Sequence, residues 1–282
     1  MESITEALVK SVIQKRPADS YKGNFGRVTL VGGDAHYGGA ILMAAESCVQ
    51  AGAGLTTVIT DRSNHTSLHS RRPEAMVVDW QDFAAVERAI ETADVLLVGP
   101  GLGESTTARK LLHFILSHRR QEQWLILDGS ALTLLAGIPI AELATTLRFP
   151  ETVVLTPHQM EWQRLSRIPI KEQTAPRNRK SQRLLGAMLV LKSHRTEIYA
   201  KTHHYQNPLG NPGMATGGTG DTLAGLLAAF LGQFPKDSKT IAAGVYLHSA
   251  IGDALYQENY VVLPTLLSAQ IPKWMKNYST KH

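Results

Sequence analysis

The sequence predicts an α/β fold with a mostly parallel central sheet that is covered by helices on both faces. Short runs rich in Val, Ile and Leu are bounded by Gly, Pro or Asp, as expected for strands buried on both faces. Segments with a helical spacing of apolar residues lie between most of these runs, from Arg27 to about Leu191. Such alternation favours right-handed βαβ units and therefore a parallel sheet. No linker or internal repeat interrupts the pattern, so we expect one domain over 1–282.

The predicted elements follow one another closely. Apolar residues at helical spacing, from Ile4 to Ile13, predict an amphipathic N-terminal helix over 1–21. Strands are expected at Arg27–Val31, Leu55–Thr60, Met76–Val78, Val95–Val98, Leu125–Leu127, Val153–Leu155 and Met188–Leu191. Helices are expected at Gly39–Gln50, Ala84–Thr92, Thr106–Ser117, Ser130–Leu135, His158–Leu165 and Gln182–Gly186. Beyond these we expect a short strand at Glu197–Ala200 and helices at Thr219–Leu231, Ser238–Glu258 and Leu263–Tyr278.

Two polar stretches are predicted to be irregular. Pro169–Arg179 is expected to be a mobile loop, and the pair His203-His204 is expected to lie in a loop.

Composition and charge exclude several classes of protein. With 43% apolar and 19% charged residues the chain is an ordinary globular protein, and no apolar run approaches the roughly 20 residues of a membrane span. The net charge is +5, and seven Lys or Arg lie from Arg164 to Arg183. No aromatic residue interleaves them, so a solvated face or steering of a phosphate-bearing substrate is favoured over nucleic-acid binding. The lone Cys48 gives no sign of export, and a cytoplasmic location is expected.

The strongest chemical signal is a glycine-rich segment that opens into an apolar helix. In Gly217-Gly218-Thr219-Gly220-Asp221, backbone N–H groups can converge at the helix N-terminus. Gly218, Thr219 and Gly220 are therefore predicted to form an anion hole for a transferring phosphoryl group. Asp221 can accept a proton from a nucleophilic hydroxyl. A glycine-led helix cap is the structural alternative, but four glycines within nine residues exceed what a cap needs.

Two more glycine clusters follow predicted strands. They are Val31–Ala40 and Val98–Ser105, and both precede predicted helices. Ligands of open parallel sheets bind outside the carboxyl ends of the strands, so both clusters are candidate walls of a substrate site. Turns use glycine in any case, which is the structural alternative.

Two further loops carry polar side chains to the same edge. Thr156–Glu161 begins a helix, where His158 faces the rim and Glu161 could bind Mg²⁺ directly or through water. A capped helix start is the structural alternative for both residues. Leu191–Thr196 carries a Lys and a Thr that can hold nucleotide phosphates, with a basic hairpin turn as the alternative.

These segments, in this order, resemble the ADP-dependent NAD(P)H-hydrate dehydratases, which are carbohydrate-kinase-like repair enzymes of the ribokinase-like superfamily. The resemblance covers about Lys22 to Gln257. Its motifs are KGNFGRVTLVGG, YGGA, PEAMV, VGPGLG, LDGSAL, LTPHQME, the LK-x-x-x-T run and GNPGMATGGTGD. It implies a ribokinase-like three-layer sandwich with 22–278 as the catalytic core.

The resemblance also implies a reaction and its residues. The S epimer of hydrated NADH or NADPH would be phosphorylated from ADP (or ATP) and would then lose phosphate, giving NAD(P)H, AMP and phosphate. By motif position, Ala40, Gly103, His158 and Asp221 would bind the hydrated cofactor, with Asp221 as the base. The nucleotide would be held by Lys192, Ser193, His194, Arg195, Thr196 and Gly220. Family members use Mg²⁺ and form homo-oligomers, so a homotetramer is expected.

Two residues depart from the family pattern. Ser193 stands where a glycine is usual, and Thr222 stands where Val is frequent. A small-molecule kinase on the same fold, acting on a vitamin precursor or a sugar hydroxyl, is the competing hypothesis. A non-enzymatic nucleotide-binding protein is a third, against which the intact glycine turn and Asp221 argue.

Overall fold

In the computed structural model, which describes residues 1–279, the strands of that range join one ten-stranded sheet. Its order is β1-β10-β9-β8-β7-β6-β5-β2-β3-β4. The strands are β1 (Glu2–Ser3), β2 (Arg27–Val31), β3 (Leu55–Thr60), β4 (Met76–Asp79), β5 (Val95–Val98), β6 (Trp124–Leu127), β7 (Val153–Leu155), β8 (Met188–Leu191), β9 (Glu197–Tyr199) and β10 (His204–Gln206). Strands β2 to β8 pair in parallel, and only β9 runs antiparallel to its neighbours. The predicted mostly parallel sheet is confirmed.

The strand order reverses beside β2. From β2 the chain proceeds outward through β3 and β4, then returns to β5 on the other side of β2 and continues through β6, β7 and β8. In open parallel sheets, ligands bind at the carboxyl ends of the strands that flank such a reversal. The loops after β2 and β5, the two glycine clusters of the sequence, lie at this point.

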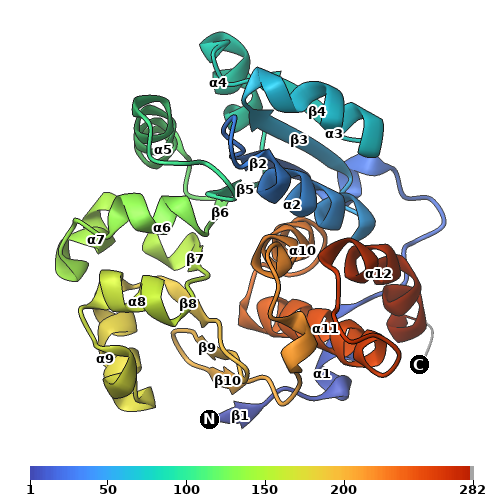
Figure 1. The fold of residues 1–282 in the computed structure, drawn as a ribbon, viewed down its shortest axis with the longest axis vertical. Coiled ribbons are helices and arrows are strands. Elements are labelled where there is room, and N and C mark those ends of the chain that lie inside the picture. The colour runs from blue at the N-terminus through green and yellow to red at the C-terminus, as the bar shows by residue number, and fades with distance from the viewer. Residues whose placement is uncertain (280–282) are drawn as a thin grey trace.

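Helices cover both faces of the sheet, as Figure 1 shows. One layer contains α1 (Glu6–Val12), α2 (Gly38–Gln50), α3 (His65–Arg71), α10 (Thr219–Gln233), α11 (Ser238–Tyr256) and α12 (Pro264–Ser279). The other contains α4 (Phe83–Glu91), α5 (Thr106–His118), α6 (Ser130–Leu135), α7 (Ile140–Thr146), α8 (Gln159–Ser166) and α9 (Ala175–Leu185).

Two apolar cores result, one on each face of the sheet. Successive residues of a strand point to opposite faces. Leu30 of β2 and Leu97 of β5 accordingly belong to the core under α10, whereas Val31 and Val98 belong to the other core. Strands buried on both faces need apolar side chains at every position, which explains the continuous Val/Ile/Leu runs.

Two expectations about local structure are wrong. The predicted loop Pro169–Arg179 is largely helical: a short 3₁₀ turn is followed by α9, which begins at Ala175. Asn178 is buried there because its Oδ1 accepts a hydrogen bond from Trp162 Nε1 (2.9 Å), a tertiary contact that no local pattern reveals. His204 begins β10 and does not lie in a loop.

The N-terminal helix is shorter than predicted. It spans Glu6–Val12, and the residues before it form β1, which pairs in parallel with β10. Helices α3 and α7 were not predicted, since each has only seven residues and therefore a weak periodic signal. Within residues 1–279, none of the helices combines the length and the apolar character that crossing a membrane requires.

Candidate active site

The loops after β2 and β5 are joined by backbone hydrogen bonds. Gly33 N donates to Pro100 O (2.9 Å), and Asp34 N donates to Gly101 O (2.7 Å). Gly103 has a φ of +72°, a conformation that favours glycine, and a Cβ there would meet the Asp34 carboxylate. The two glycine clusters therefore form one continuous wall at the reversal point of the sheet.

Ala40 lies beside this wall. It is the third residue of α2, and its Cβ lies 3.2 Å from the position that a Cβ on Gly101 would take. Ala40, at the start of α2, and Gly103, in the loop after β5, therefore lie on adjoining parts of this wall, and their contact with the substrate stays a prediction.

The glycine-rich segment leads into α10, and Asp221 stands in its first turn. Gly218 is the N-cap residue, with a φ of +98°. Helix α10 packs closely against α2: Ser47 Oγ donates to Thr222 O (2.6 Å), and a Cβ on Gly225 would collide with the backbone of Ala44. Two helix N-termini therefore meet the same edge of the sheet, and each favours negative charge on a ligand.

A buried ion pair lies among these loops. Lys192 Nζ is 2.6 Å from Asp128 Oδ1, and the side chain of Asp128 is only 4% exposed. Thr156 Oγ1 donates to the same carboxylate oxygen (2.7 Å). The ammonium group also lies 3.2 Å from the position of a Cβ on Gly220. The predicted phosphate-binding lysine therefore reaches the predicted anion hole.

Asp128 is a site residue to which the sequence analysis assigned no role. It follows β6 directly, as Lys192 follows β8, so both side chains project from carboxyl ends of parallel strands. An acid placed immediately after a fully buried strand was the signal that could have identified it.

The charges of the site influence one another. Burial raises the pKa of Asp221 to about 6, with the negative charge of Asp128 adding to the shift and Lys192 opposing it. Burial alone would lower the pKa of Lys192, but the charges of Asp128 and Glu161 outweigh it and raise that pKa. Lys192 is therefore a permanent cation, and Asp221 is a carboxyl group whose proton affinity suits acid–base chemistry near neutral pH.

His158 and Glu161 form the capped start of α8. His158 Nδ1 accepts from Met160 N (3.1 Å), and Glu161 Oε2 accepts from His158 N (2.8 Å). Burial raises the pKa of Glu161, although Lys192 opposes the shift. Among residues 1–279 no group of three or more His, Cys, Asp or Glu side chains is arranged to hold a metal ion. The substrate contact of His158 and the metal role of Glu161 stay predictions beyond this structural role.

The predicted nucleotide-binding run Lys192–Thr196 is the hairpin between β8 and β9. Ser193 Oγ accepts from Arg195 N (3.1 Å), and Thr196 Oγ1 donates to Ser193 O (3.2 Å). Ser193 does not have a positive φ, so its place where a glycine is usual causes no backbone strain. Asn207 N donates to Thr196 O (2.9 Å), which ties the hairpin to the start of the connection that leads from β10 to the glycine-rich segment.

The hydroxyl of Thr219 sits inside the predicted anion hole. Its Oγ1 is shielded from solvent and makes no hydrogen bond to any residue in the described part of the chain. The donor role predicted for it, and the anion hole of Gly218, Thr219 and Gly220 as a whole, stay predictions that the local geometry permits.

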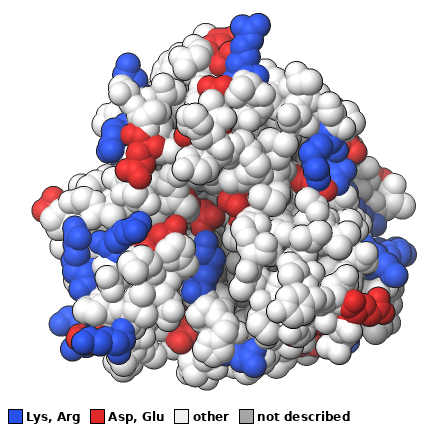
Figure 2. Space-filling model, in the orientation of Figure 1, with Lys and Arg blue, Asp and Glu red and all other residues white. Residues whose placement is uncertain are grey.

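Figure 2 shows acidic and basic side chains meeting near the middle of this face of the molecule, over the line of strands. Further Lys and Arg gather over α8 and α9, where the basic stretch of the sequence lies. A cationic surface beside the site is suited to steering an anionic ligand toward it.

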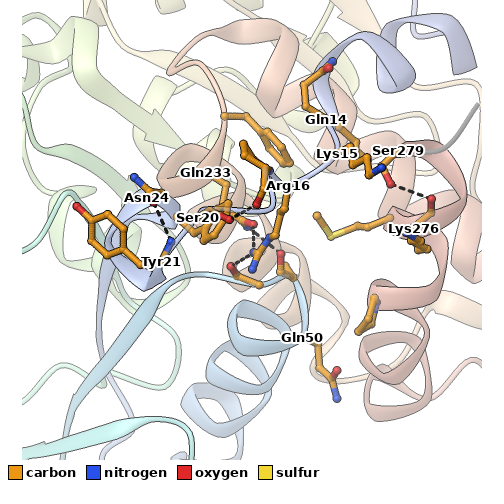
Figure 3. Close-up of a pocket in the computed structure, with 18 of the residues that line it drawn as sticks. Gln14, Lys15, Arg16, Ser20, Tyr21, Asn24, Gln50, Gln233, Lys276 and Ser279 are labelled. Atoms are coloured by element: carbon orange, nitrogen blue, oxygen red, sulfur yellow. Dashed lines mark hydrogen bonds between the residues drawn. The ribbon is translucent and has the colours of Figure 1, made fainter. Parts of the chain in front are cut away.

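A hollow at the opposite edge of the sheet is distinct from this site. It is lined by residues that precede β2, by residues that precede β3, by the C-terminal end of α10 and by α12. Figure 3 shows Arg16 bridging it. Its guanidinium donates to Gln233 Oε1 (2.6 Å) and to the carbonyl of Gly52, and lies over the ring of Phe25. Arg16 therefore uses its hydrogen-bond donors within the protein. The hollow also lies at the amino ends of the strands, whereas ligands of open parallel sheets bind at the carboxyl ends.

Comparison with known families identifies the chain. The model of the family described as NAD(P)H-hydrate dehydratase matches residues 28–273. The chain belongs to this family. The match includes every site residue named above, and the ADP-dependent dehydratase family suggested by the motifs is confirmed.

Relatives of known name extend along the whole length. A protein of Enterococcus faecalis named ADP-dependent (S)-NAD(P)H-hydrate dehydratase is 53% identical over 100% of this chain and 95% of its own. One of the same name from Lactiplantibacillus plantarum is 50% identical over 99% of this chain and 98% of its own.

Solved structures of NAD(P)H-hydrate dehydratase relatives agree with the fold. A ribokinase-like superfamily protein from Enterococcus faecalis has a TM-score of 0.95 at 53% identity, covering 99% of this chain and 96% of that one. The ADP/ATP-dependent NAD(P)H-hydrate dehydratase of Bacillus subtilis, co-crystallised with ATP and Mg²⁺, has a TM-score of 0.85 at 26% identity, covering 98% of both chains. The predicted ribokinase-like three-layer fold is confirmed.

Proposed function

We propose that this chain catalyses the ADP-dependent dehydration of the S epimer of hydrated NADH or NADPH, giving NAD(P)H, AMP and phosphate. The observation that carries the proposal is the Asp221 carboxyl in the first turn of α10, within the electrostatic reach of Lys192 and Asp128. A base beside a cation and a helix N-terminus can take a proton from an alcohol while a phosphoryl group is transferred. Relatives at 45 to 53% identity bear this activity in their names.

The order of the steps follows from the leaving groups. Hydroxide leaves poorly and phosphate leaves well, so phosphorylation comes first. Asp221 accepts the proton of the ring hydroxyl. At the same time the hydroxyl oxygen attacks the β-phosphorus of ADP, and AMP departs. The lone pair of the ring nitrogen then expels phosphate, and loss of a proton from the adjacent ring carbon restores the double bond. A pKa of about 6 leaves Asp221 ionised at neutral pH, as the first step requires.

The remaining residues bind and orient the two substrates. Ala40 and Gly103 line the hydrated nicotinamide side, because the loops after β2 and β5 adjoin the reversal point of the sheet. His158 is assigned to the same side by its position in the family motif. The hairpin Lys192–Thr196 and Gly220 hold the nucleotide, and the ammonium group of Lys192 reaches from the hairpin to Gly220.

Mg²⁺ fits this site through its donor chemistry. The carboxylate of Glu161 lies close enough to Lys192 to affect its pKa, at the nucleotide side of the site. Magnesium is commonly held by one or two carboxylates together with substrate phosphates and water, so a preformed cluster of three side chains is not needed. When bound with the nucleotide it would neutralise charge on the phosphates, and Glu161 would hold it.

The reaction is tested by incubating the protein with hydrated NADH and ADP. Recovery of the reduced-nicotinamide absorbance, with AMP and phosphate formed in equal amounts, is the expected result. A small-molecule kinase would instead leave a stable phosphorylated product and no recovery of absorbance, which would contradict the proposal. Parallel reactions with ATP and with hydrated NADPH measure the two preferences.

Two further proposals concern the setting of the enzyme. Homotetramer formation and a cytoplasmic location follow from family resemblance and from the lone buried cysteine, Cys48. Light scattering of the purified chain measures the first, since a monomeric mass would refute it. Fractionation of cells that express the chain measures the second, since recovery in the secreted fraction would refute it.

A further inference from the structure

One face of α11 carries polar side chains that contact the segment 207–222, which leads from β10 through the glycine-rich turn into the first turn of α10. Positions 248, 249, 252 and 253 lie on this face, because residues three and four apart are neighbours on a helix surface. Ser249 Oγ accepts a hydrogen bond from Asn207 Nδ2 (2.8 Å), at the beginning of the segment. Gly252 lies against Met214, where a Cβ would collide with the thioether. The contacts of Asp253 and His248 follow the segment toward α10.

Asp253 binds the middle of the segment with both carboxylate oxygens. Oδ2 accepts from Gly210 N (3.2 Å), and Oδ1 accepts from Asn211 Nδ2 (2.7 Å). Because a carboxylate can only accept, the second bond also fixes the orientation of the Asn211 amide. Hydrogen bonds to a charged group are among the stronger ones in proteins, so this is the firmest attachment of the segment to α11.

His248 binds the far end of the segment, at the first turn of α10. Its Nε2 is 3.0 Å from Thr222 Oγ1, and the side chain is almost completely buried. The hydroxyl of Thr222 is also placed to donate to Thr219 O (2.9 Å). Burial lowers the pKa of His248 to about 4, so the ring is neutral at physiological pH and acts as a hydrogen-bonding group without charge.

The segment needs such support because its own structure is sparse. Between β10 and α10, from 207 to 218, only the short 3₁₀ turn Pro212–Met214 is regular. Glycine-rich backbone loses much conformational entropy when it is fixed. Gly210 packs against the carbonyl of His194 in the nucleotide hairpin, and the other end becomes the turn that carries Asp221. Whatever fixes this segment also fixes the distance between hairpin and base.

We propose that this face of α11 is a positioning surface for phosphoryl transfer, with Asp253 as its main positioning residue. Asp253 touches neither substrate; it acts through Gly210 and Asn211 to hold the cradle and Asp221 in register with the nucleotide hairpin. The inference rests on the proposed function, because positioning matters only if this cradle carries the reaction. Neither the family motifs nor the position of ligands at the carboxyl ends of parallel strands places α11 in the site. Its side chains act on the segment and not on the substrates.

The test replaces Asp253→Asn, which keeps the shape of the side chain but leaves one of the two donors without an acceptor. We expect kcat for dehydration to fall by about ten- to a hundredfold, the loss associated with a hydrogen bond to a charged group. The KM for the hydrated cofactor should change less than about threefold, because the side chain of Asp253 bonds Gly210 and Asn211 and not Ala40, Gly103 or His158. Amide exchange within 207–218 should rise at least about tenfold.

The matched control is Thr240→Val, also in α11. Thr240 is buried, and its hydroxyl makes no hydrogen bond to a described residue, so kcat and exchange should match those of the wild type. A rescue variant combines Asp253→Asn with Asn211→Asp. It reverses the direction of the side-chain bond while keeping an acceptor for Gly210 N, and it should recover most of kcat. Failure of the rescue, with a fold as stable as that of Asp253→Asn, would count against positioning.

Two results would overturn the inference. One is an Asp253→Asn protein with the kcat and the amide exchange of Thr240→Val. The other is measured on the wild type alone, so it applies even if Asp253→Asn does not fold. The Gly210 amide should exchange at least about tenfold more slowly than the Gly217 amide, and equal rates would refute the attachment. Inactive wild-type protein with the predicted exchange pattern would instead refute the proposed function and leave the attachment intact.

Discussion

At the scale of single residues, the site depends on one carboxyl group whose ionised form is disfavoured by its surroundings. Asp221 is removed from water and lies near a second acid, Asp128, and Lys192 compensates only in part. The sequence could predict Asp221 because a glycine turn and an acid at a helix start form a local pattern. It could not predict the pairing of Asp128 with Lys192, because 64 residues separate them and only the sheet brings them together.

The raised pKa of Asp221 predicts the pH dependence of catalysis. The base must be ionised, so kcat/KM should fall as the pH drops through about 6. Asp128→Asn removes a negative neighbour and leaves the charge of Lys192 uncompensated, and both changes lower the pKa of Asp221. The acidic limb of the profile should therefore move to lower pH by up to about one unit. An unchanged limb would show that Asp128 does not act on the base.

The same shift predicts a gain in stability when the charge is removed. The folded state binds a proton at Asp221 more tightly than the unfolded state, so the stabilisation from protonation is complete below about pH 4 and is lost as the pH rises through 6. Asp221→Asn never ionises and should be more stable at pH 8, by on the order of 1–3 kcal/mol. The difference should vanish toward pH 4. Urea unfolding at both pH values measures it, and a less stable variant at pH 8 would disagree with the account.

At the scale of secondary-structure elements, the strands were the most predictable parts and the attachments between helices the least. Continuous apolar runs located β2 to β8 within one residue of their ends, because burial on both faces leaves no other composition. The first part of helix α9, before Gln182, was missed because the polar Asn178 is buried by a contact with Trp162 and not by a local pattern. Polar residues of α11 gave a signal that was not used, namely His248 and Asp253 in the mainly apolar C-terminal two-thirds of the helix.

The contact between α2 and α10 predicts a sharp steric limit. A Cβ on Gly225 would collide with the carbonyl group of Ala44, so Gly225→Ala must push α10 away from α2. We expect a loss of stability of about 1–3 kcal/mol and lower activity, because Asp221 moves with the helix. Gly137→Ala is the matched control, since nothing lies within 4 Å of its Cβ position. Equal stability of the two variants, measured by thermal unfolding, would mean that α10 is not held this closely.

At the scale of the whole molecule, the two edges of the sheet differ in what they can do. The carboxyl edge collects the glycine loops, two helix N-termini and the titratable groups, whereas the opposite edge has a hollow that Arg16 bridges. The sequence predicted that the site lies at the carboxyl edge, because the position of the loops follows from the βαβ pattern. It did not predict the hollow, whose lining comes from four separate parts of the chain.

This division predicts that a charge in the hollow is irrelevant to catalysis. Lys15 lines the hollow and is exposed. Lys15→Ala should leave kcat, the KM for ADP and the KM for the hydrated cofactor within about twofold of the wild type, since surface charges far from a site are largely screened. Steady-state kinetics at physiological ionic strength checks this, and a large rise in the KM for ADP would place nucleotide binding at the wrong edge.

The most direct measurement concerns the base itself. Asp221→Asn keeps the glycine turn, the ion pair of Lys192 and the shape of the side chain, and removes the negative charge together with the capacity to accept a proton. Calorimetric titration with ADP and turnover of hydrated NADH are measured on the same preparation. The account predicts ADP binding within about threefold of the wild type and turnover reduced by at least about a hundredfold, as for loss of a general base. Turnover at the wild-type rate would contradict it.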